Sequence, residues 1–143
     1  MERPVRSVIE DQKPITANAD MTVAAAARLM KAQQVGALLV LSEGRLTGIF
    51  TERDALFRVI AEGRDPAKTR VSEVMTANPR TIAPDRPFGH ALHLMYEGGF
   101  RHVPVVDNGR PLGVVSARDA LGPDLEQFIA DLDKRQHIGE ILG

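Results

Sequence analysis

The chain has 143 residues, of which 43% are hydrophobic and 26% charged, as in an ordinary globular domain. A net charge of −1 argues against nucleic-acid binding, because phosphate contacts need a basic surface. The absence of cysteine excludes disulfides, thiol nucleophiles and cysteine zinc sites. The charged start, and the lack of an apolar run of about 18 residues, predict neither a secretory signal nor a membrane span. We therefore expect a cytoplasmic protein.

The sequence repeats itself after 65 positions. Under this shift Thr16 coincides with Thr81, and the tetrapeptide that begins at Arg53 coincides with the one that begins at Arg118. The alignment needs no gap from Arg6 to Leu121. Chance identities would be scattered, so the chain contains two copies of one unit.

Each copy predicts the order β-α-β-β-α, and the whole chain therefore an α/β (α+β) fold. The first copy begins with a segment that carries Thr16. A helix capped by Asp20 should follow, with one face formed by Val23, Ala26, Ala27 and Met30. Two strands over 37–41 and 46–51, joined by a turn, and a helix after Thr51 complete the copy. The second copy begins with a segment that carries Thr81. A helix capped by Asp85 should follow, with one face formed by Phe88, Ala91, Leu92 and Met95. Two strands over 102–106 and 112–116 and a helix after Ser116 complete the copy.

The composition divides the chain into four parts. Residues 6–62 form the first copy, and residues 63–70 form a connector rich in glycine, proline and charge. Residues 71–122 form the second copy. Residues 123–143 predict a C-terminal helix and tail, with apolar residues on one helical face.

Two heptapeptides resemble a known ligand motif. GIFTERD at residues 48–54 and GVVSARD at 113–119 resemble the motif of cystathionine-β-synthase (CBS) domains, and RHVPVVD at 101–107 resembles a second signature of that family. The resemblance extends over residues 6–121 and implies a stand-alone, bacterial-type Bateman module. In such a module two CBS repeats pair about a pseudo-twofold axis and form two clefts, which often bind AMP, ADP, ATP, NAD(H) or S-adenosylmethionine. Modules of this family commonly form homodimers.

Asp54 and Asp119 have two interpretations. Each lies three residues after a hydroxyl residue, Thr51 or Ser116, which is the spacing of a capping box at a helix start. Alternatively, each carboxylate accepts hydrogen bonds from the two hydroxyls of a ribose. The resemblance favours ribose recognition, and the two roles are partly compatible.

The copies differ at the start of one strand. Arg101 and His102 stand where the first copy has Gly36 and Ala37. An arginine fork suits a phosphate, so we interpret Arg101, assisted by His102, as a phosphate anchor. This predicts two unequal sites, although the sequence does not say which aspartate shares its ligand with Arg101.

The resemblance also assigns the wall around the base. It implies that Thr16 and Thr81 close this wall, and that Ala37 leaves room for a flat ring. Taken alone, each threonine is equally well explained as a β-branched residue in a strand.

No catalytic or metal site is predicted. His90 and His93 have a helical spacing that metals can use, but no third ligand accompanies them, and an exposed helix face explains them better. No catalytic triad, nucleophile elbow, P-loop or GxGxxG motif is present, so we expect no enzyme and no catalytic cofactor.

The leading hypothesis is a regulatory module that binds AMP, ATP or NAD(H) and acts on an unknown regulated protein. The alternatives are binding of S-adenosylmethionine, or an interaction scaffold without a nucleotide in which both aspartates are only helix caps.

Overall fold

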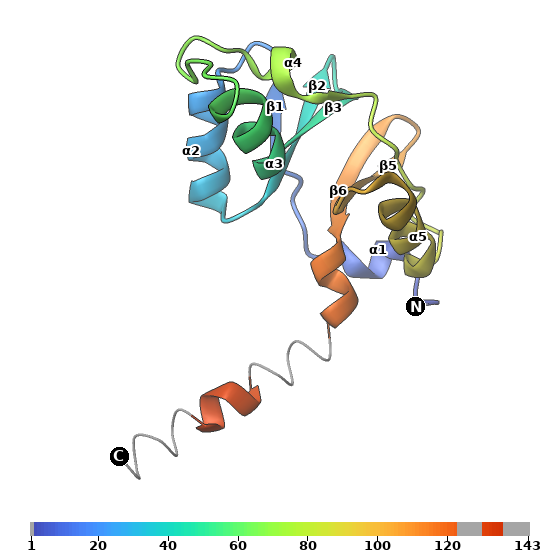
Figure 1. Cartoon of the computed structure of the whole chain (residues 1–143). Coiled ribbons are helices and arrows are strands. Elements are labelled where there is room, and N and C mark those ends of the chain that lie inside the picture. Colours follow the sequence, from blue (N-terminus) through green and yellow to red (C-terminus); the bar gives the residue numbers. More distant parts are fainter. Residues whose placement is uncertain (1, 123–129, 136–143) are drawn as a thin grey trace.

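The computed structural model describes residues 2–122 and 130–135, which build two similar α/β lobes (Figure 1). The first lobe contains a four-stranded sheet in the order β1-β2-β3-β4, and the second a two-stranded sheet, β5-β6. The predicted mixed α/β fold with two related units is confirmed.

The first lobe follows the predicted order of elements. It contains β1 (Thr16–Asn18), α2 (Val23–Gln33), β2 (Ala37–Ser42), β3 (Arg45–Thr51), α3 (Glu52–Asp54) and the π-helix η1 (Ala55–Ile60). Strand β1 runs parallel to β2, and β2 runs antiparallel to β3. Helix α2 buries Val23, Ala26 and Met30 against the sheet, whereas Ala27 is exposed, contrary to the prediction.

The second lobe repeats this pattern with one strand reduced to a bridge. It contains α5 (Phe88–Gly98), β5 (His102–Asp107), β6 (Arg110–Ser116) and the 3₁₀-helix η2 (Ala117–Leu121). In place of β1, Ile82 forms a single parallel bridge to Val105. Helix α5 buries Phe88, Ala91 and Met95.

Both hairpins close through the same two-residue turn. Glu43 and Gly44 adopt positive φ angles of 52° and 78°, and Asn108 and Gly109 adopt 52° and 81°. Two positive φ angles in succession match the right-handed twist of the flanking strands, and glycine adopts the second without steric cost. The two predicted hairpins are thus confirmed.

The predicted helix caps at Asp20 and Asp85 are wrong. Helix α2 begins one residue after Thr22, whose side chain accepts a hydrogen bond from the backbone N–H of Ala25 at 3.1 Å. Helix α5 begins after Pro87, which has no side-chain cap. Threonine and proline stand nearer the first helical turn than the aspartates and fix the chain direction there.

Each lobe contains a short helix that the sequence analysis assigned to the other copy. Helix α1 (Val5–Val8) packs beside α5, and Val5 and Ile9 join the core of the second lobe. Helix α4 (Val71–Val74) is followed by β4 (Thr76–Ala77), which pairs with β3, and it adds two valines to the core of the first lobe. Figure 1 shows both helices beside their lobes.

The ungapped alignment is wrong at its start. The N–H of Val5 bonds to the carbonyl of Arg86, and the N–H of Val71 bonds to that of Met21, both at 2.8 Å. Val5, and not Arg6, is therefore the equivalent of Val71. The first copy carries one more residue between this helix and the strand that follows.

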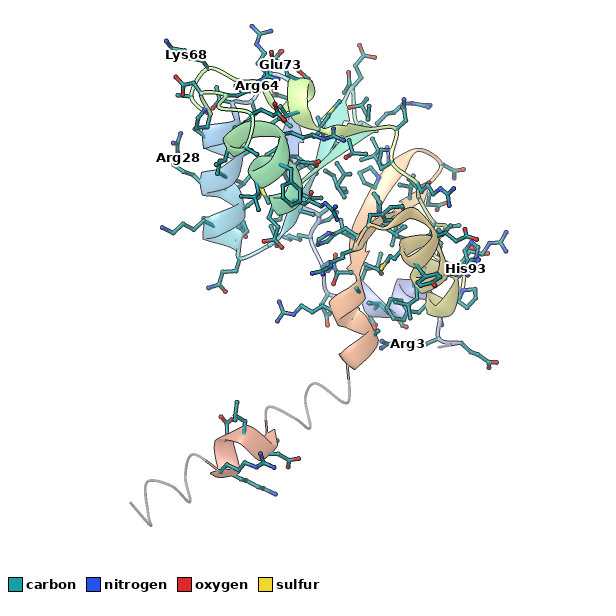
Figure 2. The ribbon with its side chains drawn as sticks, viewed as in Figure 1. Arg3, Arg28, Arg64, Lys68, Glu73 and His93 are labelled. Atoms are coloured by element: carbon teal, nitrogen blue, oxygen red, sulfur yellow. The ribbon has the colours of Figure 1, made fainter. Side chains whose placement is uncertain are left out.

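The connector is partly fastened to the first lobe. Its carbonyl groups at Pro66 and Thr69 accept hydrogen bonds from the start of α2 at 2.9 and 2.8 Å. Arg64 forms a 2.8 Å ion pair with Glu73 (Figure 2). Thr69 is buried, whereas residues 63–68 are exposed, as expected for a connector.

A third apolar cluster lies where the two sheets meet. Ala37, Leu39 and Ile49 are buried there, and Val114 of β6 packs against them. This cluster brings the ends of β3 and β6, and therefore the two Thr/Ser-x-x-Asp segments, to the same region of the molecule.

The predicted C-terminal helix is present over residues 130–135, whose side chains are exposed. The remainder of the predicted helical face lies outside the described residues. Within the described chain, no helix has the length and apolar character needed to cross a bilayer.

Candidate functional site

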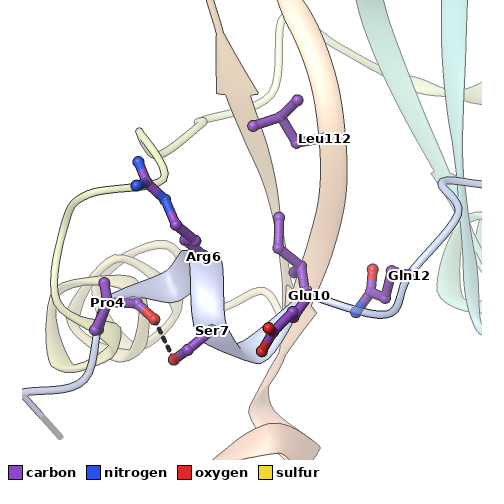
Figure 3. Close-up of a pocket in the computed structure, with 7 residues that line it drawn as sticks. Pro4, Arg6, Ser7, Glu10, Gln12 and Leu112 are labelled. Atoms are coloured by element: carbon purple, nitrogen blue, oxygen red, sulfur yellow. Dashed lines mark hydrogen bonds between the residues drawn. The ribbon is translucent and has the colours of Figure 1, made fainter.

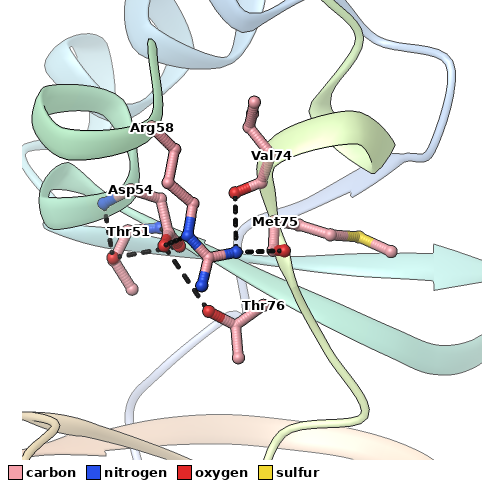
Figure 4. A network of polar contacts seen from close by, with 6 residues as sticks. All are labelled: Thr51, Asp54, Arg58, Val74, Met75 and Thr76. Carbon is pink, nitrogen blue, oxygen red and sulfur yellow. Dashed lines mark hydrogen bonds and ion pairs between the residues drawn. The ribbon is translucent and has the colours of Figure 1, made fainter. Parts of the chain in front are cut away.

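A capping box forms at the junction between β3 and α3 (Figure 4). The backbone N–H and the hydroxyl of Thr51 donate to Asp54 Oδ2 at 3.1 and 3.2 Å. In return, the N–H of Asp54 donates to Thr51 Oγ1 at 3.2 Å. One carboxylate oxygen is thus used to close the helix start.

The second oxygen of Asp54 also has two protein groups near it, both at 3.5 Å. Arg58 Nε lies 3.5 Å from Asp54 Oδ1, and the Thr76 hydroxyl donates to the same oxygen at 3.5 Å. Arg58 also donates from Nη1 to the carbonyls of Val74 and Met75, at 3.4 and 2.9 Å. Asp54 is only 7% exposed. Its carboxylate therefore fastens η1 and the chain around β4 to the first sheet.

The junction between β6 and η2 contains the equivalent box without this network. The N–H of Ser116 donates to Asp119 Oδ2 at 2.7 Å, and the Ser116 hydroxyl to the same oxygen at 3.4 Å. Within the described part of the chain, no group bonds to Asp119 Oδ1. Asp119 is also less buried than Asp54. The described residues thus engage one oxygen of Asp119, against both oxygens of Asp54.

Arg101 and His102 lie beside this box. The N–H of Ala117 bonds to the carbonyl of Arg101 at 2.9 Å, and His102 pairs with Ser116 across the hairpin. Arg101 is exposed. The structure thus places Arg101, His102, Ser116 and Asp119 at one end of the second hairpin, where His102 also feels the charge of Glu52 from the first lobe. Which aspartate shares a ligand with Arg101 remains open.

The imidazole of His102 is half-buried and feels charges from both lobes. Burial lowers the pKa of His102 below its ordinary value, and Arg101 lowers it further. The carboxylates of Glu52 and Asp119 act in the opposite direction. His102 thus feels an acid of the first lobe and an acid of the second, while burial favours its neutral form.

The remaining predicted residues lie farther from these groups. Ala37 pairs with Thr51 and is buried in the cluster between the sheets. Thr16 is exposed and lines a pocket of about 400 Å³ with Met21 and Leu41, a set that does not include Asp54. Thr81 is exposed next to the bridge at Ile82. Their assignment to the base wall remains a prediction.

A second pocket lies beside the N-terminal segment (Figure 3). It has a volume of about 510 Å³ and is lined by Pro4, Arg6, Ser7, Ile9, Glu10, Gln12 and Leu112. At its edge, the Gln12 amide donates to the carbonyl of Val114 and accepts from its N–H, both at 3.0 Å. The side chain thereby imitates a neighbouring strand on β6, where the first sheet has β4.

The described residues contain no group of three His, Cys, Asp or Glu side chains that could hold a metal ion. His93 Nε2 lies 2.9 Å from Glu97 Oε1, and His90 is exposed. Figure 2 shows His93 on the outer side of α5.

Sequence reasoning missed Arg58, Thr76 and Glu52. Arg58 follows Asp54 by four residues, so the spacing of helical ion pairs could have indicated it. Thr76 reaches Asp54 only through the packing of α4 and β4, and Glu52 approaches His102 only through the pairing of the lobes.

A family model, "CBS domain", matches the chain twice, over residues 5–61 and 71–123. The protein belongs to the CBS domain family. The two matches correspond to the two copies, so the chain contains a tandem CBS pair.

Relatives and solved structures agree with this assignment. The chain is 38% identical over 104 residues to the CBS domain-containing protein YhcV of Bacillus subtilis, covering 73% of this chain and 74% of that protein. It is 42% identical over 109 residues to CBSCBSPB1 of Arabidopsis thaliana, covering 75% of this chain but only 20% of the plant protein. The CBS domain pair of MJ0100, solved in complex with 5′-methylthioadenosine and S-adenosyl-L-methionine, is 29% identical, with a TM-score of 0.74 and coverage of 82% of this chain and 96% of that one.

The contrast between the two aspartates generates a prediction about stability. Asp54→Ala should lower the free energy of unfolding by about 1–3 kcal/mol, because it leaves buried donors unpaired. Asp119→Ala, which removes contacts at a more exposed junction, should cost less. Urea unfolding of both variants measures the difference, and equal losses would contradict the distinction drawn between the two boxes.

Proposed function

We propose that this CBS pair is a ligand-sensing module that binds an adenine nucleotide at the second repeat. The observation that carries the proposal is Asp119 Oδ1, to which no group of the described chain bonds, at the same junction as Arg101 and His102. Asp119 would accept from the ribose hydroxyls, and Arg101 would pair with a phosphate.

The chemistry of these groups favours a phosphorylated ligand. AMP, ATP and NAD(H) each combine a ribose with a phosphate, whereas S-adenosylmethionine has no phosphate for Arg101. The likeness to the MJ0100 pair, with its methylthioadenosine and S-adenosylmethionine, supports an adenosine-containing ligand but not its phosphate. Thr81 would lie along the base, and Thr16 and Ala37 would take the equivalent places in the first repeat.

We further propose that the module acts without catalysis, by transmitting its occupancy to a regulated protein. Binding becomes a signal only where the ligand has different affinities for two states of the module. An exposed apolar surface on η1 of the first repeat is a candidate contact for another protein chain. Leu56, Phe57 and Ile60 of η1 are 51%, 51% and 67% exposed. We propose that a second copy of the chain covers this apolar surface, giving a homodimer.

A scaffold that binds no nucleotide is the second candidate. It is favoured by Asp54, whose two oxygens are both engaged by the protein, as a purely structural cap would be.

Ligand-dependent stabilisation separates the two functions. We expect AMP, ATP or NADH to raise the melting temperature, since a ligand at about 100 times its Kd adds about 2.7 kcal/mol of stability. Asp119→Ala should weaken that ligand about tenfold to a hundredfold, because a hydrogen bond to a charged group contributes about 1.5–3 kcal/mol. Asp85→Ala, at an exposed aspartate outside the junction, is the matched control. If neither a nucleotide nor S-adenosylmethionine raises the melting temperature of the wild-type chain, the scaffold becomes the supported function.

His102 predicts the pH dependence of binding. Its pKa is lowered in the free protein, and a phosphate beside it would raise that pKa, so binding would take up a proton. Affinity for AMP should therefore rise as the pH falls from about 8 to about 6. His102→Gln should remove this rise and leave the opposite trend of AMP itself, whose phosphate takes up a proton near pH 6 and then pairs less strongly with Arg101. Titration calorimetry in two buffers of different ionisation enthalpy measures the proton uptake, and equal uptake in both proteins would rule out this role.

The proposed dimer predicts a change in mass. Phe57→Asp should convert the dimer to a monomer in light scattering, because it places a charge in the apolar surface. Tyr96→Asp is the control, since Tyr96 is 89% exposed on α5, away from this surface. A dimer that persists in Phe57→Asp would place the contact elsewhere.

A further inference from the structure

The two repeats hold their junction aspartates through different groups. In the first repeat Arg58 and Thr76 approach the carboxylate of Asp54. In the second repeat Arg3 Nη2 donates a hydrogen bond to the backbone carbonyl of Asp119 at 2.8 Å. This contact joins residues 116 positions apart, and Figure 2 shows Arg3 in the second lobe. The second junction is thus held through the main chain of its aspartate, and the carboxylate takes no part in the contact.

The carbonyl of Asp119 lies in the last turn of η2, where backbone acceptors lack partners within the helix. The N–H of Gly122 bonds to the same carbonyl. A Cβ atom added to Gly122 would lie 3.5 Å from Arg3 Nη2, so the guanidinium passes close to the end of the helix. A cation at this end is stabilising, because the terminal carbonyl groups carry partial negative charge.

Arg3 is itself fixed at the start of α5. Its carbonyl accepts a hydrogen bond from the N–H of Phe88 at 2.8 Å, and the adjacent residues Pro4 and Pro87 form a bridge. The guanidinium carbon lies 5.1 Å from the centre of the Phe88 ring, a distance at which a cation is attracted to the ring face. Phe88 is fully buried. Arg3 therefore links the end of η2 to the core of the second lobe.

The first repeat has a threonine at the position of this arginine. The N–H of Val23 bonds to the carbonyl of Thr69 at 2.8 Å, as that of Phe88 bonds to the carbonyl of Arg3, so Thr69 is the equivalent residue. The Thr69 hydroxyl donates to the carbonyl of Asp65 at 2.8 Å. The side chain at this position is thus engaged within the connector in one repeat and at the aspartate in the other.

We propose that Arg3 is a positioning residue for the nucleotide site of the second repeat. The inference rests on the proposed function and adds to it a residue of the N-terminal segment. Arg3 fixes the backbone of Asp119, while Oδ1 of that residue keeps no bond within the described chain. A ribose then meets an acceptor that is already oriented, so less conformational freedom is lost on binding.

Hydrogen exchange tests the contact without a nucleotide. Arg3→Ala should speed the exchange of the backbone amides of residues 117–122, because the end of η2 loses a partner. Arg6→Ala is the matched control, since it removes the same charge from an exposed residue of α1. Equal exchange in the two variants would show that Arg3 does not hold η2, whatever the chain binds.

Affinity tests the effect on the ligand. In titration calorimetry of the full chain, Arg3→Ala should weaken AMP about threefold to tenfold, which corresponds to the loss of one hydrogen bond. Arg3→Lys keeps a cationic donor and should restore most of the affinity, and Arg6→Ala should bind as the wild type does. An Arg3→Ala variant with wild-type affinity would overturn the positioning role.

A double-mutant cycle separates positioning from other effects. In the Asp119→Ala background, Arg3→Ala should cause no further loss of AMP affinity, because Arg3 acts through this aspartate. An undiminished further loss would overturn the proposal, since Arg3 would then act by its own charge or on the whole fold. A wild-type chain that binds no AMP would overturn the proposed function, and the exchange experiment would still decide whether Arg3 holds η2.

Discussion

A carboxylate has two oxygens, and the capping box at each strand–helix junction uses one of them. The two repeats differ in which groups contact the remaining carboxylate oxygen. In the first repeat Arg58 and Thr76 bind Asp54 Oδ1 and make the aspartate a fastening between η1 and the chain around β4. In the second repeat no group of the described chain bonds to Asp119 Oδ1. Within the described chain, one local motif thus engages both carboxylate oxygens in one lobe and a single oxygen in the other. A capping role therefore leaves an acceptor over for the ribose proposed at the second repeat.

The sequence predicted best those features that local chemistry determines. Each hairpin has a glycine at the second turn position, and a continuous apolar run specifies the strand before it. The helical faces of α2 and α5 followed from their spacing, except at Ala27. The cap predictions failed because two candidates competed, and Thr22 stands closer to the first turn of α2 than Asp20 does. Both residue types can cap a helix, so the position of Thr22 directly before the first helical residue determined which one caps α2.

Features that depend on distant packing could not be predicted. Nothing local to Val5 shows that it belongs to the core of the second lobe, because that lobe begins far along the chain and the carbonyl that Val5 bonds to is that of Arg86. The Thr76 bond to Asp54 likewise requires α4 to pack on the first lobe. For the site, the sequence predicted the asymmetry at Arg101 and His102 but not the approach of Glu52. That acid became significant only when the structure placed it near His102.

The exchange of α1 and α4 limits how a bound ligand could act. The chain crosses between the lobes after each of these helices, and each crossing is fastened to a sheet edge, by Gln12 on β6 and by β4 on β3. Separating the lobes would therefore break the hydrogen bonds of Gln12 to β6 or of β4 to β3, and would disturb the packing of α1 and α4 in the two cores. A hinge opening is thus a costly response. A smaller response is open to the module at the junctions themselves, because His102 feels Glu52 of the first lobe and Asp119 of the second. A nucleotide phosphate beside this imidazole would change its charge, and that change would act on carboxylates of both lobes without separating them.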